Sequence, residues 1–144
     1  MSIKIAIGSD HAGFDLKQHL LDYLKSKTYS VNDKGCYSAE RADYPDFGHA
    51  VAMSVLNKEV DFGVLMCGSG NGINMSANKH AGIRAALCWN SEIASLARLH
   101  NDANILVLPA RYITMEEAEK CLDIFLSTKF EGGRHQARVE KIDI

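Results

Sequence analysis

A chain of 144 residues is of the usual length for one domain, and we expect a single domain over residues 1–144. A composition of 47% hydrophobic and 24% charged residues supplies a core, and a net charge of −2 without a basic cluster argues against nucleic acid or an anionic membrane as a partner. No apolar run approaches the roughly 20 residues that span a bilayer, and no signal peptide is evident, so we expect a cytoplasmic protein.

Apolar segments and helical patterns alternate along the chain. Strands are predicted at 3–8, 29–35, 62–67, 82–88 and 104–109, and the near-continuous apolar runs suit parallel strands buried on both faces. Helical spacing is shown by three sets of residues: Leu16, Leu20 and Leu24; Phe47, Val51 and Val55; and Ile93, Leu96, Ala97 and His100. A capping box at 114–117 predicts a helix to about residue 127, and a short helix is expected within 134–142. The alternation predicts an α/β fold, a three-layer α/β/α sandwich around a five-stranded parallel sheet (Rossmann-like).

Polar segments follow the first, third and fifth predicted strands. They read "GSDH" (8–11), "CGSGNG" (67–72) and "PAR" (109–111). Sheets of this class bind ligands beyond the carboxyl ends of their strands. We therefore expect these three segments to meet in one site.

The glycine loop is the first candidate element. Gly68, Gly70 and Gly72 permit positive φ and close backbone approach, so that successive amides could hold an oxyanion or a phosphate. The spacing matches neither a Walker loop nor a dinucleotide fingerprint, and a cysteine phosphatase loop would need arginine where the chain has Ile73. A plain strand-to-helix turn is the alternative.

Four cysteines occur, without C-x-x-C pairs or zinc-ligand spacing to a histidine, so we expect no metal and no cofactor. Cys36, Cys88 and Cys121 suit core positions, because cysteine behaves as a small hydrophobe. Cys67 differs, since it borders the glycine loop, and the nearby amides predict a lowered pKa. With the Ser69 hydroxyl to relay protons, the set suits carbonyl chemistry in which a proton leaves carbon.

Further polar residues have two interpretations each. Asp10 and His11 are expected at the lip of the site, although Asp10 could instead cap the following helix. His100 is either a half-buried residue at a helix end or an acid–base group.

Arg134 and Arg138 lie four residues apart, which puts both on one helical face and suits phosphate recognition. The alternative is a solvated face balanced by Glu131 and Glu140. Arg111 lies just past the fifth strand, near the proposed site.

Five long motifs resemble a known family. "GSDHAGFDLK", "DYPDFG", "CGSGNGINMSANK", "RLHNDANIL" and "FEGGRHQARVE" are similar to the type B ribose-5-phosphate isomerases of the ribose/galactose isomerase family, over essentially the whole chain. The resemblance implies a metal-free aldose–ketose isomerase of the pentose phosphate pathway. It would interconvert D-ribose 5-phosphate and D-ribulose 5-phosphate by ring opening and an enediolate.

The resemblance also implies roles for individual residues. Cys67 would be the base, and the amides of Gly68, Ser69, Gly70, Asn71 and Gly72 would hold the enediolate oxygens. His100, helped by Asp10, would open the furanose ring. Asn101 would contact sugar hydroxyls, Tyr44 would pack on the substrate, and His11, Arg111, Arg134 and Arg138 would bind the phosphate. Some members use a glutamate just after the loop; Ile73 stands there, which indicates the cysteine-dependent group.

The family forms homodimers, often paired into tetramers, whose sites both subunits line, so His100, Asn101 or Arg111 could come from a partner. Two other functions stay open. An isomerase of allose 6-phosphate or galactose 6-phosphate would keep the same catalytic residues. A non-catalytic phosphosugar- or nucleotide-binding module would need the amides and arginines but would have no use for an activated Cys67 thiol.

Overall fold

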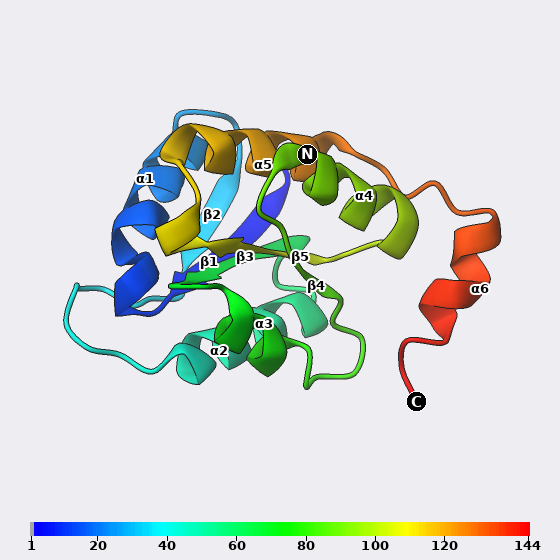
Figure 1. Cartoon of the computed structure of the whole chain (residues 1–144), viewed down its shortest axis with the longest axis horizontal. Coiled ribbons are helices and arrows are strands. Elements are labelled where there is room, and N and C mark those ends of the chain that lie inside the picture. The colour runs from blue at the N-terminus through cyan, green and yellow to red at the C-terminus, as the bar shows by residue number, and fades with distance from the viewer. Residues whose placement is uncertain (1) are drawn as a thin grey trace.

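The computed structural model describes residues 2–144 and contains one parallel sheet of five strands in the order β2-β1-β3-β5-β4 (Figure 1). The strands are β1 (Lys4–Ser9), β2 (Ser30–Asp33), β3 (Phe62–Cys67), β4 (Ala85–Leu87) and β5 (Ile105–Pro109). All four strand pairs are parallel, so the predicted five-stranded parallel sheet is confirmed. The strand order is a finding of the structure, because the apolar runs alone predict no order.

Helices cover both faces of the sheet, which confirms the three-layer architecture. Figure 1 shows α1, α4 and α5 on one face and α2 and α3 on the other. Their bounds are α1 (Phe14–Lys25), α2 (Tyr44–Leu56), α3 (Asn71–Ala77), α4 (Ser91–Asn101), α5 (Met115–Ser127) and α6 (Arg134–Glu140). Two short 3₁₀ turns that the periodicity did not predict, η1 (His11–Gly13) and η2 (Ala110–Tyr112), directly follow β1 and β5.

The core is divided by the sheet into two clusters. Leu20, Leu108 and Phe125 belong to the cluster beneath α1, α4 and α5, whereas Val51 and Ile73 belong to the one beneath α2 and α3. The central strands are buried almost throughout, as their apolar runs predict. The edge strands β2 and β4 are only partly buried.

The ends of α4 and α5 carry the expected capping chemistry. The Asn90 side chain accepts from the amide of Ile93 at 2.9 Å, and the Thr114 hydroxyl accepts from the amide of Glu117 at 3.0 Å. Helix α4 stops at Asp102, whose left-handed φ of 48° turns the chain into β5. Asn90 thus fixes the start of α4 and Asp102 its end, and therefore where the last residues of α4 lie.

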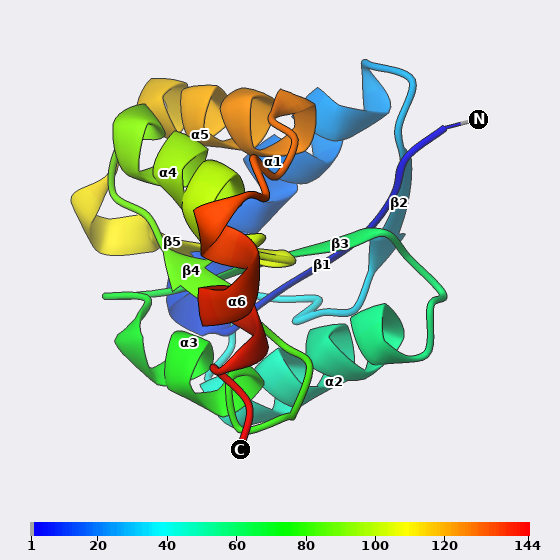
Figure 2. The same ribbon diagram turned by 90° about the vertical axis from the view of Figure 1, so that its right-hand side faces the viewer.

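The C-terminal segment leaves the α5 layer and crosses one end of the molecule. Figure 2 shows α6 at this end, between α4 and the layer of α2 and α3. The amide of Glu131 donates to the carbonyl of Leu99 at 3.1 Å, which fixes the segment to the last turn of α4. Within residues 2–144, every helix is too short or too polar to cross a membrane.

Candidate active site

Three loops meet at the carboxyl edge of the sheet. Strands β1, β3 and β5 are neighbours, and their register pairs Ser9 with Met66 and Cys67 with Pro109. The loops that follow must then lie side by side, and η1, which follows β1, contacts η2, which follows β5. The predicted convergence of the three polar segments is confirmed.

The glycine loop is packed too closely to accept side chains at two positions. Gly70 has a φ of 82°, and a Cβ there would lie 2.5 Å from the Leu87 side chain. A Cβ on Gly72 would lie 2.5 Å from the Tyr44 ring. Glycine therefore allows Tyr44 to lie directly against the loop, at the place where it was expected.

Cys67 ends β3 and is only 4% exposed. Burial raises the pKa of its thiol above the ordinary value, and the nearby Asp10 carboxylate adds to this, while the backbone amides of Ile73, Gly70 and Gly72 oppose it. The predicted lowering of the Cys67 pKa is thus wrong for this chain, because desolvation outweighs the amides. The thiol is protonated at neutral pH, and the thiolate, once formed, is a stronger base.

Asp10 and His11 occupy the lip of the site, and each is held by the backbone. Asp10 accepts from the amide of Gly13 at 3.1 Å, so the alternative interpretation as a helix cap is realised. His11 Nδ1 lies 3.1 Å from the carbonyl oxygen and 3.2 Å from the amide nitrogen of Ala42. Whichever of these bonds Nδ1 makes, the second ring nitrogen of His11 has no hydrogen bond within the described part of the chain and is available to a ligand.

Ser69 and Asn71 are exposed on the loop, where a ligand can reach them. The Ser69 hydroxyl oxygen lies 3.3 Å from both the backbone and the side-chain nitrogen of Asn71.

Arg111 contacts the glycine loop of its own chain. Its amide donates to the carbonyl of Gly68 at 3.0 Å, and its guanidinium is 3.3 Å from the position of a Cβ on Gly68. The expectation that Arg111 could come from a partner is therefore wrong.

Four expected site residues lie elsewhere, namely His100, Asn101, Arg134 and Arg138. Helix α4 returns from the carboxyl end of β4 to the amino edge of the sheet, where the Gly63 amide donates to the Asn104 carbonyl at 3.0 Å. Gly63 and Cys67 are four strand residues apart, or about 13 Å. The structure does not bring these four residues to Cys67 of the same chain.

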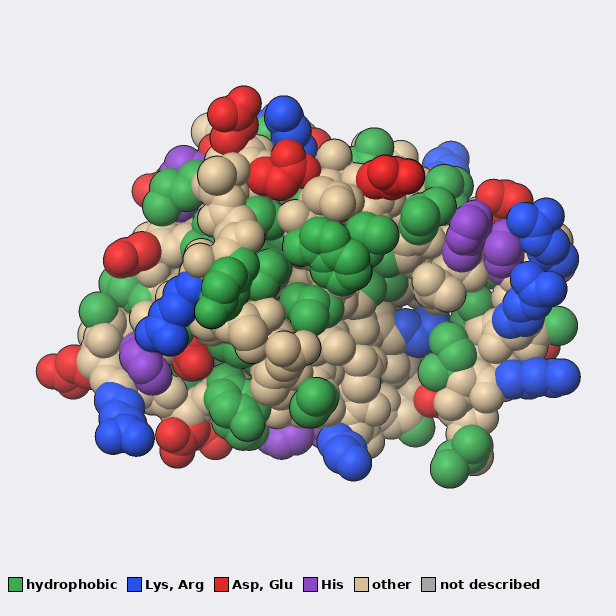
Figure 3. All heavy atoms as spheres, viewed as in Figure 1, with side chains coloured by type: hydrophobic (Ala, Val, Ile, Leu, Met, Phe, Trp, Pro, Cys, Tyr) green, Lys and Arg blue, Asp and Glu red, His purple; other side chains and the backbone are tan. Residues whose placement is uncertain are grey.

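At the end of the molecule where α6 lies, Figure 3 shows histidine side chains next to Lys and Arg side chains. The rings of His100 and His135 are stacked, with centroids 4.3 Å apart and planes at 15°. Burial, followed by the charges of His100 and Arg134, lowers the pKa of His135, against an opposing effect of Glu131. Arg134 and Arg138 are exposed on α6, in the helical register that their spacing predicts.

One structural support of the site was missed by sequence reasoning. The chain after β2 returns to the end of β1, where the Cys36 amide donates to the Ser9 carbonyl at 2.8 Å and the Ser9 amide donates to the Gly35 carbonyl at 2.7 Å. The same loop carries Ala42, which fixes His11. Contacts between residues 27 and 31 positions apart leave no local sequence signal.

A parallel sheet that presents a thiol, an amide-lined loop and an arginine at its carboxyl edge defines an α/β enzyme for small anionic substrates. The model of one family, described as Ribose/Galactose Isomerase, matches residues 5–142. The chain belongs to this family and is a sugar phosphate isomerase.

Individual relatives match over nearly the whole chain. Ribose-5-phosphate isomerase B of Escherichia coli is 48% identical over 139 residues, 96% of this chain and 93% of the relative. A crystal structure of a ribose 5-phosphate isomerase from Thermotoga maritima is 53% identical, with a TM-score of 0.98 over 99% of both chains. The enzyme from Mycoplasma genitalium, solved with bound ribulose-5-phosphate, is 46% identical, with a TM-score of 0.93 over 99% of this chain and 95% of the other.

Proposed function

We propose that the protein interconverts D-ribose 5-phosphate and D-ribulose 5-phosphate, with Cys67 as the base. The observation that carries the proposal is the Cys67 thiol at the end of β3, beside the amides of Gly70 and Gly72 and next to Arg111. A thiol contributes nothing to phosphate binding alone, so its position favours catalysis over a binding module. The relative with bound ribulose-5-phosphate supports the choice of substrate.

The reaction divides into ring opening and proton transfer. An acid donates a proton to the furanose ring oxygen while a base takes the proton from the C1 hydroxyl, which yields the free aldehyde. The Cys67 thiolate then removes the proton on C2, and negative charge develops on the enediolate oxygens. Amides of the glycine loop stabilise this charge, Ser69 relays a proton between O1 and O2, and the Cys67 thiol returns its proton to C1.

The raised pKa of Cys67 fits this chemistry. A proton on the carbon beside a carbonyl is a very weak acid, so a more basic thiolate has the larger driving force to remove it. The consequence is a smaller thiolate fraction at neutral pH, since burial disfavours the charged form. Phosphate binding far from C1 and C2 supplies energy that orients both carbons against the one base.

We further propose that a second copy of the chain completes the site. The carboxyl edge of one copy carries Cys67, Asp10 and Arg111, and the opposite end of another would supply the acid His100 of the partner subunit and the phosphate ligands Arg134 and Arg138 of the partner subunit.

The surface around the glycine loop supports contact with a second copy. Tyr44 and Met75 are 41% and 64% exposed and line one shallow hollow beside Gly72, and Trp89, two residues after β4, is 56% exposed. Apolar side chains of this size around a polar site are typical of an interface.

The test is a coupled assay of ribose 5-phosphate, allose 6-phosphate and galactose 6-phosphate with EDTA present. We expect the highest kcat/KM on ribose 5-phosphate, and turnover that persists with the chelator. Preference for a six-carbon substrate would contradict the assignment of the sugar while keeping the role of Cys67. Absence of isomerisation of all three sugars would contradict the proposal.

A further inference from the structure

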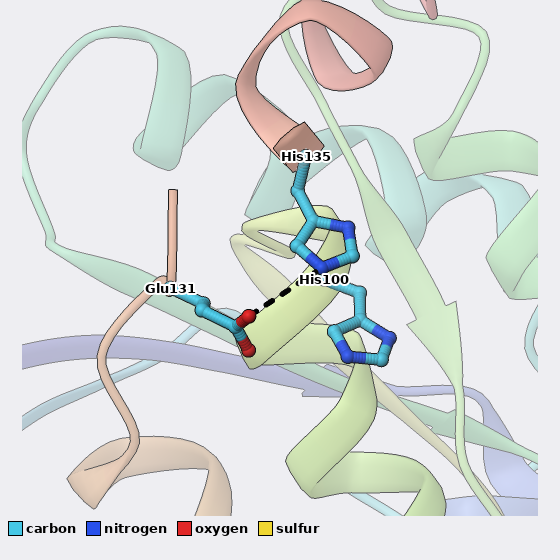
Figure 4. Close-up of side chains that lie close together, drawn as sticks. All are labelled: His100, Glu131 and His135. Atoms are coloured by element: carbon cyan, nitrogen blue, oxygen red, sulfur yellow. Dashed lines mark ion pairs between the residues drawn. The ribbon is translucent and has the colours of Figure 1, made fainter. Parts of the chain in front are cut away.

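Three side chains with metal-ligating atoms converge at the end of the molecule opposite Cys67. Figure 4 shows the Glu131 carboxylate directed at the rings of His100 and His135. One ligand atom from each of the three residues lies within 4.8 Å of the others, and His135 Nε2 is 3.8 Å from Glu131 Oε1. Within residues 2–144 this is the one such group of three or more histidine, cysteine or acidic residues.

The backbone builds this arrangement from two segments. The hydrogen bond from the Glu131 amide to the Leu99 carbonyl fixes the acidic residue beside His100. Gly132 and Gly133 then adopt φ values of 71° and 55°, a left-handed conformation that turns the chain into α6. This turn places the side chain of His135, in the first turn of α6, against those of Glu131 and His100.

The strongest observation is an unpartnered polar atom. His135 is 6% exposed, and its buried Nε2 has no hydrogen-bond partner among residues 2–144. The Glu131 carboxylate, at 3.8 Å, is too far away to supply one. Buried polar atoms are almost always satisfied, so an orphaned ring nitrogen aimed at a carboxylate and a second imidazole indicates a missing ligand.

We infer that His100, Glu131 and His135 form a binding site for Zn²⁺ or a similar borderline divalent cation. Two imidazole nitrogens and one carboxylate oxygen are the donor set of an open zinc site, with a fourth position left for water or a substrate oxygen. Donors around a tetrahedral zinc lie about 3.4 Å apart, whereas the ligand atoms here lie within 4.8 Å of one another, with 3.8 Å between Glu131 and His135. The stacked rings of His100 and His135 therefore have to rotate until their nitrogens converge on the ion. Imidazole ligands select zinc over magnesium and calcium.

The charge around the site makes the binding reversible. Glu131 contributes the one negative charge of the three ligands, and Arg134 and Arg138 lie one residue before and three residues after His135 on α6. Two guanidinium groups oppose a cation, so this site binds more weakly than a closed structural zinc site of thiolates. A reversible site suits control of the protein rather than its folding.

We expect bound zinc to inhibit the isomerase. This consequence rests on the proposed function, whereas zinc binding does not. A His100 ring that ligates zinc stays neutral, with its one proton on the other nitrogen, and is held against Glu131 and His135, so it is withdrawn as the acid for a ring oxygen. Ring opening would stop while the Cys67 step stayed intact, so zinc should inhibit turnover of the furanose form. Chelators should restore activity, in agreement with a reaction that needs no metal.

The test measures zinc binding to the full-length protein after removal of metals, by calorimetry without substrate and by the absorption spectrum with Co²⁺. We expect one ion per chain, no competition from Mg²⁺, and the visible bands of tetrahedral cobalt. Glu131→Gln and His135→Phe should each weaken binding by at least about tenfold, and the phenylalanine keeps a ring stacked on His100. His49→Ala is the matched control, because His49 and His80 form a separate pair with nitrogens 2.8 Å apart.

The possible results separate cleanly. The inference is overturned if the parent binds no zinc, if Glu131→Gln and His135→Phe both bind as the parent does, or if His49→Ala abolishes binding. Zinc inhibition that is present in the parent and lost in Glu131→Gln supports inhibition through this site. Zinc binding in a protein that isomerises no sugar phosphate would leave the metal site standing and contradict the proposed function alone.

Discussion

The two ends of the sheet carry different groups of the residues that we propose to act in one reaction. The carboxyl edge holds a buried thiol and amides, with Cys67 4% and Asp10 6% exposed, whereas the amino edge presents the exposed Arg134 and Arg138 beside the half-buried His100. The first group consists of buried side chains and loop amides; the second consists largely of long charged side chains on the surface. This difference indicates that the first group suits the reacting carbons and that the second suits capture of an anion.

Cys67→Ala should have the largest effect, because it removes the proposed base from the carboxyl edge. We expect kcat on ribose 5-phosphate to fall by about 10³-fold or more, with substrate binding nearly unchanged. Steady-state kinetics and calorimetry with ribose 5-phosphate measure the two quantities. Cys36→Ala, a buried cysteine outside the glycine loop, is the control and should retain turnover. Parent-like turnover of Cys67→Ala would remove the thiol from the mechanism.

His100→Asn tests the amino edge and should come next. Loss of a positioned acid typically lowers the rate by about 10²-fold. Because His100 is proposed to act only in ring opening, the rate should fall with furanose ribose 5-phosphate. The fall should be much smaller with an open-chain substrate. Ribulose 5-phosphate, assayed in the reverse direction over its first turnover, is such a substrate. Equal losses on both would assign His100 to another step.

Arg138→Ala should have a smaller effect that appears in KM. A charged hydrogen bond to phosphate contributes about 1.5–3 kcal/mol, so KM should rise by roughly 10- to 100-fold while kcat changes little. Lys141, exposed just after α6, offers a control of equal charge. If Lys141→Ala raised KM as much as Arg138→Ala, the effect would be general electrostatics and not a phosphate contact.

At neutral pH the smallest effect concerns the core thiols, which contrast with the edge thiol because they act on stability only above about pH 9. Burial raises the pKa of Cys88 and of Cys121 to about 12, from an ordinary value of 9.0. The unfolded thiols ionise first, so stability is complete below about pH 9 and falls by about 1.4 kcal/mol per pH unit for each thiol as the pH rises toward 12. Denaturant unfolding at several pH values measures this slope. Cys88→Ala should reduce it, and an unchanged slope would contradict the burial argument.

The carboxyl-edge half of the site could be predicted from the sequence because it follows from local patterns. Apolar runs give the strands, the strands' ends give the loops, and one rule about parallel sheets brings Asp10, Cys67 and Arg111 together. The pKa of Cys67 could not be predicted in this way. The amides that lower it are visible in the glycine loop, but the burial that raises it depends on side chains from distant segments.

The location of His100 could not be predicted with the same ease. Its helical stripe predicts α4 correctly, yet the edge at which it lies depends on where β4 begins and α4 stops. A resemblance in motifs identifies the residues of a site, but it does not show which subunit supplies each residue. The three-dimensional path puts His100 and Cys67 of one chain at opposite edges, in line with a partner as the source of His100, which the family resemblance implies.

The most direct measurement of the two-copy site is complementation between inactive variants. Cys67→Ala and His100→Asn are unfolded together and refolded as a 1:1 mixture, so that half of the dimers are hybrids. Each hybrid would contain one intact site, formed by Cys67 of one copy and His100 of the other, and the mixture should recover about a quarter of the parent activity. Activity that stays at the level of the separate variants, in a mixture with hybrid dimers verified by mass spectrometry, would contradict a site shared between two chains.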